Sequence, residues 1–403
     1  MKILVLSPRP LWPEHDGGTV ATVRCASGLA AAGAEVSVIA MKTEKHRDTG
    51  DGHTTVKPEN LVSYCVVNVD TSIRMTAMMR NLIFSNEPYD VSRFRSVAFS
   101  EEIRSHLNNN RYDIIHCEGL AMALYLNEIK RVTDVPVILR AHNLEHKIRK
   151  MMALSARSPA RRAYLSNLSQ RLFTLEQNAA RMFDAIVPIS EPDYAWFVRA
   201  SGNKPVFLAE TGTEEAKRMP EPAAGNLRVG FIGAMNWQPN IEGMNWFITS
   251  VWPEVVKKMP ETTLHIAGRT LKKEDPILPA GKNISIEGEV EDAIGFIRSN
   301  NVMIVPLFAG SGLRIKIIEA MSAGRPVVAT PVAVEGLPAT SGRELFVAPD
   351  ARSFSASLIK LLEDPSLRTL TGTNAVRLVN EHYQNGAITA RLLQFYRTLT
   401  HGS

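Results

Sequence analysis

The chain has 403 residues, 45% of them apolar and 22% charged, and 46 lysines and arginines outnumber 41 aspartates and glutamates to give a net charge of +5. This length predicts two domains of roughly 150–200 residues each. The mild positive charge is compatible with anionic substrates or an anionic membrane surface and does not require nucleic acid. No apolar run in the sequence approaches the roughly 18 residues that cross a bilayer.

Residues 1–8 combine one lysine with a short apolar run that ends at Ser7. This run is shorter than the apolar region of a signal peptide and lacks a cleavage site, so it predicts a buried first strand. The three cysteines (Cys25, Cys65 and Cys117) are odd in number and widely spaced. We expect them to fill the core in a reducing compartment, without metal-ligand spacing, and we expect a cytoplasmic protein.

Short apolar segments then alternate with amphipathic helical stretches, a pattern typical of parallel α/β layers. In the first half, strands are predicted at residues 2–7, 35–41, 64–69, 113–116, 136–140 and 185–189, and helices at about 19–32 and 161–182. Gly33 follows the first helix and is typical of a helix end. Residues 201–226 are rich in glycine, proline and charge, and they predict an inter-domain linker.

The same alternation restarts after the linker. Strands are predicted at residues 227–233, 262–267, 284–286, 302–306 and 326–330, and helices at about 241–258, 291–299, 313–323, 351–363, 365–380 and 386–399. Two open α/β domains joined by a linker place a cleft between the carboxyl ends of both sheets, where such folds bind ligands.

Residues 302–330 carry the densest chemical signal: a buried strand, a loop of small residues, a helix and another strand. The glycines within residues 310–312 let the loop turn tightly, and the helix points the positive end of its dipole at whatever lies before it. Arg314 and Lys316, predicted in the first turn, oppose that dipole by roughly 0.3–1 kcal/mol each. A bound diphosphate would reconcile both cations with the dipole. Two solvated cations paired with nearby acids remain the alternative.

Glu319 lies three residues after Lys316. It can form an ion pair with that lysine along the helix, or its carboxylate can accept hydrogen bonds from the vicinal hydroxyls of a ribose.

The residues around this helix resemble one family. The glutamate is followed, in family order, by Ala320, Met321, Gly324, Pro326, Val327 and Val328, which is similar to the signature E-x7-E, A-M-A-x-G-x-P-V-V of the retaining family 4 glycosyltransferases. Residues 227–269 and 288–292 are similar too, and the family order can be followed from Met1 to about Arg397. Ser311 replaces the family's first glutamate, which contacts the donor sugar, so the sugar stays open. The form G-S-G-x-R-x-K-x-x-E is a familiar variant of the family.

The resemblance implies the GT-B fold, an α/β fold with two Rossmann-like domains whose parallel sheets face each other across a cleft. The expected domains are residues 1–203 on the acceptor side and residues 204–380 for the donor nucleotide. The C-terminal helix, within residues 381–403, would pack back on the first domain.

The resemblance also implies roles for individual residues. Arg314 and Lys316 would neutralise the donor diphosphate, Glu319 would bind the ribose, and Gly312 and Leu313 would offer backbone N–H groups. The other donor-side candidates in this half are Gly233, Arg269, Val290 and Ser311. For Arg269 and Val290, a loop charge and a packing side chain are equally good interpretations.

In the first half, Gly17 and Gly18 lie between the first strand and its helix, where backbone N–H groups can approach a ligand. A plain turn is the alternative, but opposite a diphosphate-binding domain we expect the loop to clamp donor or acceptor, and the family carries a similar Gly-Gly loop here. The first strand is not followed by a G-x-G-x-x-G fingerprint, which argues against NAD. His142 follows a buried strand; the resemblance makes it a contact of sugar or acceptor hydroxyls, and Glu145 an acceptor-side carboxylate.

Four further polar residues follow predicted strands and could face the cleft: His116, Glu118, Ser190 and Asp193. For these we favour helix capping and packing over ligand contact.

Residues 147–171 carry seven lysines and arginines and no acid, interleaved with methionine, leucine and tyrosine, and residues 73–84 are similar in kind. Such segments are typical of helices that bind an anionic membrane surface, at about 1 kcal/mol per cation. A solvated face of the first domain is the alternative. RNA binding is a poor third, so we expect no nucleic-acid partner.

The resemblance implies a metal-independent hexosyltransferase that moves a sugar, with retention, from a nucleoside diphosphate sugar to a glycan or lipid-linked acceptor of the cell envelope or an exopolysaccharide. No cofactor is expected, because the nucleotide sugar is a substrate, and no D-x-D motif suggests a metal. Two alternatives stay open: a nucleotide-sugar epimerase of the same fold, and a non-catalytic nucleotide-sugar-binding subunit.

Overall fold

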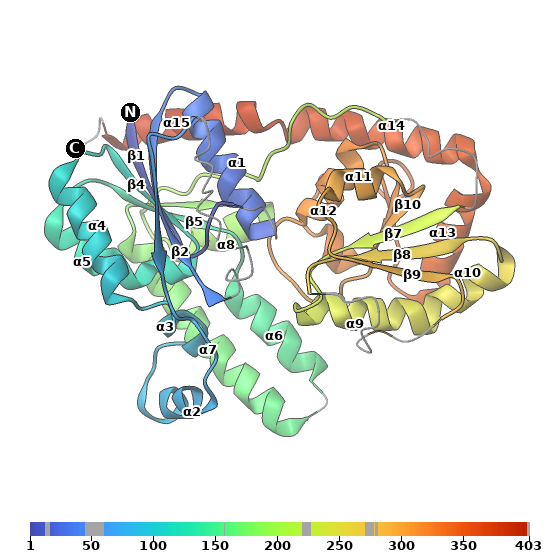
Figure 1. Cartoon of the computed structure of the whole chain (residues 1–403), viewed down its shortest axis with the longest axis horizontal. Coiled ribbons are helices and arrows are strands. Elements are labelled where there is room, and N and C mark those ends of the chain that lie inside the picture. Colours follow the sequence, from blue (N-terminus) through green and yellow to red (C-terminus); the bar gives the residue numbers. More distant parts are fainter. Residues whose placement is uncertain are drawn as a thin grey trace. The chain divides into compact units, whose positions relative to one another are not determined.

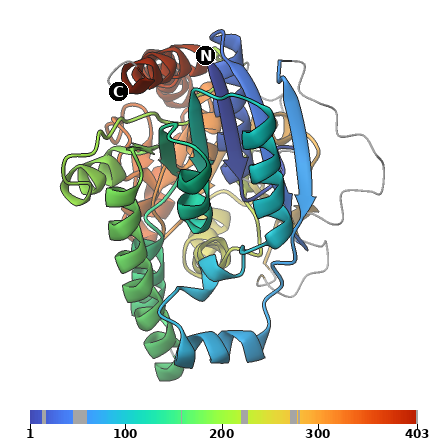
Figure 2. The ribbon, with the colours of Figure 1, turned by 90° about the vertical axis from the view of Figure 1, so that its left-hand side faces the viewer.

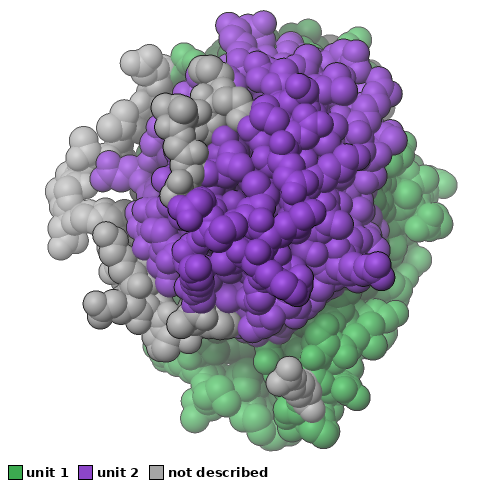
Figure 3. Space-filling view, turned by 90° about the vertical axis from the view of Figure 1, so that its right-hand side faces the viewer, with its two compact units in different colours: residues 1–212, 311–313, 385–403 green, residues 213–310, 314–384 purple. Residues whose placement is uncertain are grey.

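The computed structural model describes residues 1–12, 17–44, 60–156, 158–219, 227–270, 278 and 281–400. The chain forms two compact units, which Figure 1 shows as ribbons and Figure 3 colours separately. Unit 1 contains Met1–Gly212, Ser311–Leu313 and Asn385–Ser403, and unit 2 contains Thr213–Gly310 and Arg314–Gln384. The boundary therefore lies between Gly212 and Thr213 rather than at 203/204, and the last helix clusters with unit 1.

Unit 1 is built on six parallel strands. They are β1 (Lys2–Ser7), β2 (Glu35–Lys42), β3 (Ser63–Asn68), β4 (Ile114–Glu118), β5 (Val137–Ala141) and β6 (Ala185–Pro188), in the order β3-β2-β1-β4-β5-β6. From β1 to β3 the chain adds strands on one side of β1, and from β4 to β6 it adds them on the other side. The topological switch point, at which such sheets bind ligands, therefore lies between β1 and β4. Every residue of β4 and β5 is buried, because helices cover both faces.

On one face of this sheet lie α1 (Gly17–Ala31) and α15 (Asn385–Thr400), side by side in Figure 1. Their apolar side chains pack on alternate strand residues such as Ile114 and Ile138. The other face is covered by α4 (Val97–Asn109), α5 (Leu126–Val132), α7 (Pro159–Met182) and α8 (Glu191–Ala200), which pack on the remaining strand residues. The sheet thus has a core on each side.

Shorter elements complete unit 1: α2 (Met75–Phe84), α3 (Tyr89–Ser92), the 3₁₀ helix η2 (Leu120–Tyr125) and α6 (Glu145–Ser155). The basic stretch 147–171 therefore spans parts of two packed helices, α6 and α7, while Arg157 lies outside the described residues. In Figures 1 and 2, α2 and the tip of the α6–α7 pair extend from the same end of unit 1.

Unit 2 repeats the architecture. Its strands are β7 (Arg228–Ile232), β8 (Thr263–Ala267), β9 (Ile284–Gly288), β10 (Val302–Val305), β11 (Val327–Ala329) and β12 (Phe346–Val347), in the order β12-β11-β10-β7-β8-β9. Its helices are α9 (Gln238–Trp246), α10 (Trp252–Lys258), α11 (Ala293–Arg298), α12 (Ile315–Ser322), α13 (Ala351–Glu363) and α14 (Pro365–His382), with the 3₁₀ helix η4 (Pro331–Val334). Here the switch point lies between β7 and β10.

The predicted α/β class with two Rossmann-like units is confirmed, and each predicted strand lies within two residues of an observed one. The predicted helix 241–258 is interrupted by a π-helical turn, Phe247–Val251. Strand β12 was not predicted. Among the described residues, no helix is both long and apolar enough to span a membrane.

Candidate active site

In unit 2, three glycines lie at the carboxyl edge of the sheet: Gly233 and Gly268 follow β7 and β8, and Gly288 is the last residue of β9. The Gly233 N–H donates to the Ala267 carbonyl at 3.0 Å, and the Gly268 N–H donates to the Gly288 carbonyl at 2.8 Å. A Cβ on Gly268 would lie 1.8 Å from the Gly233 carbonyl oxygen. The loops therefore pack backbone against backbone and leave a side-chain-free shelf that a ligand can approach closely.

Lys316 lies against this shelf from the first turn of α12. Its Nζ donates to the Asn240 side-chain oxygen at 3.1 Å and lies 4.6 Å from the centroid of the Phe231 ring. A Cβ on Gly233 would lie 2.5 Å from the same Nζ, so only glycine leaves room for the amine. Burial, together with the nearby Arg314 charge, lowers the pKa of Lys316 to about 7, and Glu319 partly opposes the shift.

Arg314 is the N-cap of α12 and not part of its first turn. The helix begins at Ile315, two residues later than predicted, because the preceding loop contains two glycines with positive φ, Gly310 at +152° and Gly312 at +75°. A Cβ on Gly310 would lie 2.2 Å from an Nη atom of Arg314, so the guanidinium folds back over its own loop. Both predicted cations thus lie at the amino end of α12.

Ser311, Gly312 and Leu313 cluster with unit 1. The Ser311 hydroxyl donates to the Asp193 carboxylate at 2.9 Å and accepts the Leu144 N–H at 3.1 Å, and its side chain is buried. Ser311 is therefore a buried packing residue that joins Asp193 and Leu144 by hydrogen bonds. Ser190 stands at the N-cap of α8 but makes no capping hydrogen bond, so the predicted capping role is wrong for this residue.

In unit 1, His142 follows β5 and contacts a buried network. The Nε2 of His142 bonds to the Glu118 carboxylate, the Arg140 guanidinium lies 3.3 Å from that carboxylate, and the His116 Nε2 lies 2.9 Å from it. The Tyr396 hydroxyl, from α15, lies 2.7 Å from the His116 Nδ1. We call His116, Glu118, Arg140, His142 and Tyr396 the Glu118 network.

The prediction that this strand ends at His116 and that Glu118 follows it is wrong. Both lie within β4 and are buried, at 0% and 1% exposure. Burial alone would raise the pKa of Glu118, but Arg140 and the two histidines hold it well below its ordinary value. Burial lowers the pKa of His142, against the opposing effect of Glu118. The network therefore holds an ionised carboxylate behind a neutral imidazole.

Sequence reasoning also missed Arg9. Gly17 and Gly18 lie in the first turn of α1 instead of in the loop before it. A Cβ on Gly18 would lie 2.0 Å from an Nη atom of Arg9, and the Arg9 charge contributes to lowering the pKa of His142. A basic residue two positions after β1, at the switch point, was the available signal.

The remaining predicted site residues occupy ordinary positions. Glu145 is the first residue of α6, partly buried, and its N–H donates to Glu176 at 2.6 Å. The Arg269 carbonyl accepts the Met235 N–H at 3.0 Å. Val290 is partly buried two residues after β9. The structure gives each of them a place at a strand end or helix start without defining a role.

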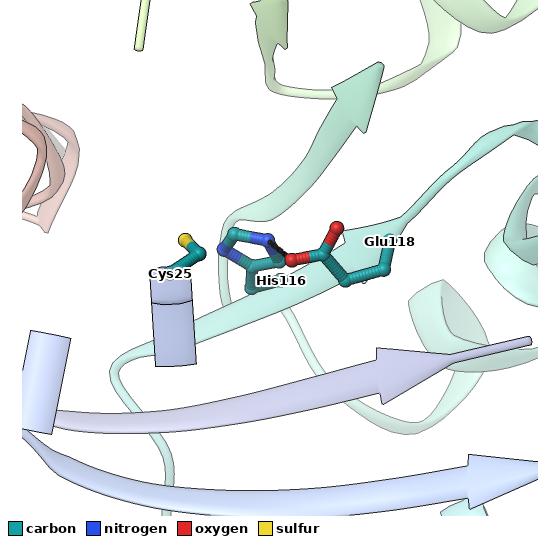
Figure 4. A group of neighbouring side chains, drawn as sticks. All are labelled: Cys25, His116 and Glu118. Atoms are coloured by element: carbon teal, nitrogen blue, oxygen red, sulfur yellow. Dashed lines mark hydrogen bonds and ion pairs between the residues drawn. The ribbon is translucent and has the colours of Figure 1, made fainter. Parts of the chain in front are cut away.

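Three metal-ligand types meet in unit 1, where Cys25, His116 and Glu118 place donor atoms within 4.8 Å of one another (Figure 4). Both ring nitrogens of His116 are already hydrogen bonded, and burial raises the pKa of the Cys25 thiol to about 12. Arg140 supplies the positive charge beside the carboxylate. These contacts favour a hydrogen-bond network over a metal centre.

Comparison with known proteins identifies the family. Residues 15–214 match the model described as Glycosyltransferase Family 4, and residues 226–364 match Glycosyl transferases group 1. The chain belongs to the family 4, group 1 glycosyltransferases. This glycosyltransferase is 25% identical over 334 residues to a phosphatidyl-myo-inositol mannosyltransferase of Mycobacterium leprae, covering 78% of this chain and 82% of that one.

Three further similarities bear on the glycosyltransferase. An uncharacterised 44.6 kDa protein in the cps region of Klebsiella pneumoniae is 27% identical over 168 residues, which cover 40% of this chain and 43% of that protein. Sucrose-phosphate synthase from Thermosynechococcus elongatus has the same fold, with a TM-score of 0.74 at 17% identity over the full length of both chains. Anabaena HepE, solved with UDP-glucose, has a TM-score of 0.69 at 15% identity, covering 99% of this chain and all of HepE.

Proposed function

We propose that this glycosyltransferase moves a hexosyl group, with retention, from a nucleoside diphosphate sugar to a glycan or lipid-linked acceptor. The observation that carries the proposal is Lys316, whose partly buried amine rests on an amide oxygen and an aromatic face beside a shelf of glycines. A lysine is costly to bury with such partners. A diphosphate at the amino end of α12 would add negative charge beside this amine.

In the proposed reaction the acceptor hydroxyl oxygen bonds to the anomeric carbon of the sugar as the bond from that carbon to the diphosphate oxygen breaks. The hydroxyl proton passes to the departing diphosphate. Arg314 and Lys316 stabilise the negative charge that develops on this leaving group, which is the main contribution of the protein and makes the reaction independent of metal. Glu319 holds the ribose, and His142 contacts a hydroxyl. No cofactor takes part.

The similar proteins support the substrate classes. Anabaena HepE was solved with UDP-glucose, which favours a nucleotide-sugar donor here. The mannosyltransferase of Mycobacterium leprae acts, by its name, on a phosphatidylinositol, and the Klebsiella protein is encoded in a cps region. Together they favour a lipid-linked or polysaccharide acceptor in envelope or exopolysaccharide synthesis.

A panel of UDP, GDP, ADP and TDP in a thermal-shift assay tests the donor site. We expect at least one nucleotide to raise the melting temperature at millimolar concentration, and Arg314→Ala combined with Lys316→Ala to abolish the shift. Lys257→Ala, at an exposed position of α10, is the matched control and should leave the shift unchanged. If no nucleotide stabilises the protein, the donor site is wrong.

Product analysis separates transfer from the two alternatives. A transferase releases free nucleoside diphosphate only in step with a glycosylated acceptor. An epimerase converts the nucleotide sugar with no second substrate, and a binding subunit leaves it unchanged.

We also propose that unit 1 meets an anionic membrane surface at α2. None of the ten residues of α2 is buried, and Met75, Met79 and Ile83 recur at four-residue spacing, so they share one face; their exposures are 65%, 49% and 66%. Phe84 at 80% extends this apolar face. Arg74 and Arg80 flank it, as in helices that lie in a membrane interface.

The cations of the basic stretch 147–171 divide into packed and exposed ones. Arg149 forms an ion pair with Asp90, and Arg171 donates to the carbonyls of Asn81 and Leu82 at the end of α2. These two arginines therefore anchor helices to each other, while Lys150, Arg161 and Arg162 remain exposed.

Liposome flotation tests the surface. We expect binding to vesicles containing an anionic lipid, and a severalfold loss with Met79→Ser combined with Ile83→Ser. Leu370→Ser, a 59% exposed leucine of unit 2, is the control. Equal flotation of both variants would refute a role for α2.

A further inference from the structure

The Glu118 network follows from strand register. Glu118 of β4 is paired with Arg140 of β5, and His116 and His142 each lie two residues away on the same strand or just beyond its end. Because side chains alternate in a strand, all four project from one face of the sheet, the face that α1 and α15 cover. The apolar core on this face, which includes Ile114 and Ile138, thus gives way to charged residues at the carboxyl edge.

The direction of each hydrogen bond is set by the carboxylate. Glu118 is ionised, so it only accepts, and the nearest nitrogens of His116 and His142 must donate. Burial raises the pKa of Tyr396 well above its ordinary value, so its hydroxyl keeps its proton. With the proton of Tyr396 in place, the His116 Nδ1 accepts from that hydroxyl and the His116 Nε2 donates to Glu118.

One competing contact exists. An Nη atom of Arg140 lies 3.4 Å from the His142 Nε2 and could in principle donate to it. The bond between His142 and Glu118 is shorter, and Arg140 has other acceptors: the Glu118 carboxylate at 3.3 Å and the Ala21 carbonyl at 3.2 Å. The contact with Glu118 therefore determines the tautomer of His142.

We propose that Glu118, held by His116, Arg140 and Tyr396, is a positioning residue that fixes His142 with its proton on Nε2. The lone pair on Nδ1 then accepts a hydrogen bond from a hydroxyl of the sugar or the acceptor. This inference rests on the proposed function only for the identity of that hydroxyl. The tautomer itself is a property of unit 1 alone.

The electrostatic surroundings keep His142 neutral. The charged groups with the largest effect on its ring are Glu118, Arg140 and Arg9, one negative and two positive. A proton on Nδ1 would add a third positive charge to a site that is almost closed to water, since the side chain of His142 is 12% exposed. His142 consequently acts as a hydrogen-bond acceptor and not as a cation.

Nuclear magnetic resonance of the protein labelled with ¹⁵N-histidine tests the tautomer directly, without substrate. The chain has ten histidines, and the signals of His142 are assigned by their loss in His142→Gln. We expect a protonated Nε2 and an unprotonated Nδ1 for His142. A proton on Nδ1 in the parent protein would overturn the inference, whatever the enzyme then does with a donor.

Two variants test the consequence for catalysis. Glu118→Gln can donate an amide proton to His142 and so permit the opposite tautomer; we expect kcat to fall by about 100-fold with little change in the donor KM. Tyr396→Phe removes only the far hydroxyl; we expect a fall of about two- to threefold in kcat and an unchanged tautomer.

Matched controls separate positioning from stability. Glu344→Gln changes a buried glutamate of unit 2 that accepts the Thr340 N–H, and Tyr125→Phe removes a buried hydroxyl that donates to the Phe94 carbonyl. Both should lower the melting temperature and leave kcat unchanged.

If Glu118→Gln lowers the melting temperature but keeps parental kcat and tautomer, Glu118 has no positioning role. If Glu118→Gln does not fold, two other results test the positioning role of Glu118: the tautomer of His142 in the parent protein and the kcat of Tyr396→Phe. If no nucleotide diphosphate binds while His142 still carries its proton on Nε2, the proposed function fails and the tautomer assignment stands.

Discussion

Lys316 makes donor binding depend on pH in a way that the structure quantifies. Its amine has a pKa of about 7 in the free protein, because burial and Arg314 disfavour its charge. A bound diphosphate brings at least two negative charges to this position, which returns the pKa toward its ordinary value of 10.5. Above pH 7, binding must therefore be accompanied by uptake of a proton.

The size of the effect follows from linkage. Each pH unit between the two pKa values costs about 1.4 kcal/mol, or about tenfold in affinity. From pH 7 to pH 9 the dissociation constant of the nucleoside diphosphate should rise by up to about 100-fold. The terminal phosphate does not complicate this range, because its second pKa is near 6. The Phe231 ring favours the charged amine by about 0.5–2 kcal/mol, which raises the pH at which the loss of affinity begins.

Isothermal titration in buffers of different ionisation enthalpy measures both the affinity and the proton uptake. Lys316→Met keeps the side-chain length without the charge, so it should bind more weakly at pH 7 and show no dependence on pH up to 9. Lys257→Met, at an exposed position, should match the parent. If the affinity of the parent protein for the nucleotide depends on pH as little as that of Lys316→Met, the role assigned to Lys316 is wrong.

The same residue affects stability with a defined sign. Lysine has a lower pKa in the folded chain than in the unfolded chain, so the unfolded chain binds more protons between pH 7 and about 10.5. Stability should therefore rise with pH across this window. Below pH 7 the free-energy cost of burying the charged amine is present in full. Lys316→Met should therefore have a higher melting temperature than the parent at pH 6, and the two melting temperatures should approach each other near pH 10.

Two further substitutions, one of them with a matched control, give specific outcomes. Gly233→Ala should weaken nucleotide binding by about tenfold or more, because the new methyl group would displace the Lys316 amine. The control is Gly386→Ala, whose new Cβ would meet no atom within 4 Å. In a melting experiment it should be neutral or stabilising by about 0.4–1 kcal/mol. Ser311→Glu, which restores the family's glutamate, should lower the melting temperature by about 5 °C, since its carboxylate would face Asp193 within a buried site; an unchanged melting temperature would contradict this.

The sequence predicted every strand of the two sheets except β12, because runs such as residues 302–306 are apolar, rich in β-branched side chains and bounded by polar turns. It was insufficient at the start of α12. Two positive-φ glycines delay that helix and leave Arg314 as its cap, and nothing in the pattern of apolar residues records backbone dihedral angles. The cations were identified correctly as a pair at a helix start, while their exact positions required the structure.

The Glu118 network was missed for a different reason. The polar residues of β4 suggested that the strand had ended at His116, whereas it continues through Glu118. The signal was present as alternation, isoleucine-histidine-glutamate on β4 and isoleucine-arginine-histidine on the stretch that includes β5. Recognising it requires knowing that these two strands are neighbours in register, which is a property of the sheet rather than of either segment.

The return of α15 to unit 1 has a consequence for folding during synthesis. The Asn385 side chain donates to the Arg24 carbonyl, a contact between residues 361 positions apart, and Tyr396 reaches His116 across 280 positions. The apolar face of α1 must therefore wait, uncovered by its partner helix, while all of unit 2 is translated. Contacts this distant in sequence close slowly, and a nascent chain exposing such a face is a natural client for chaperones.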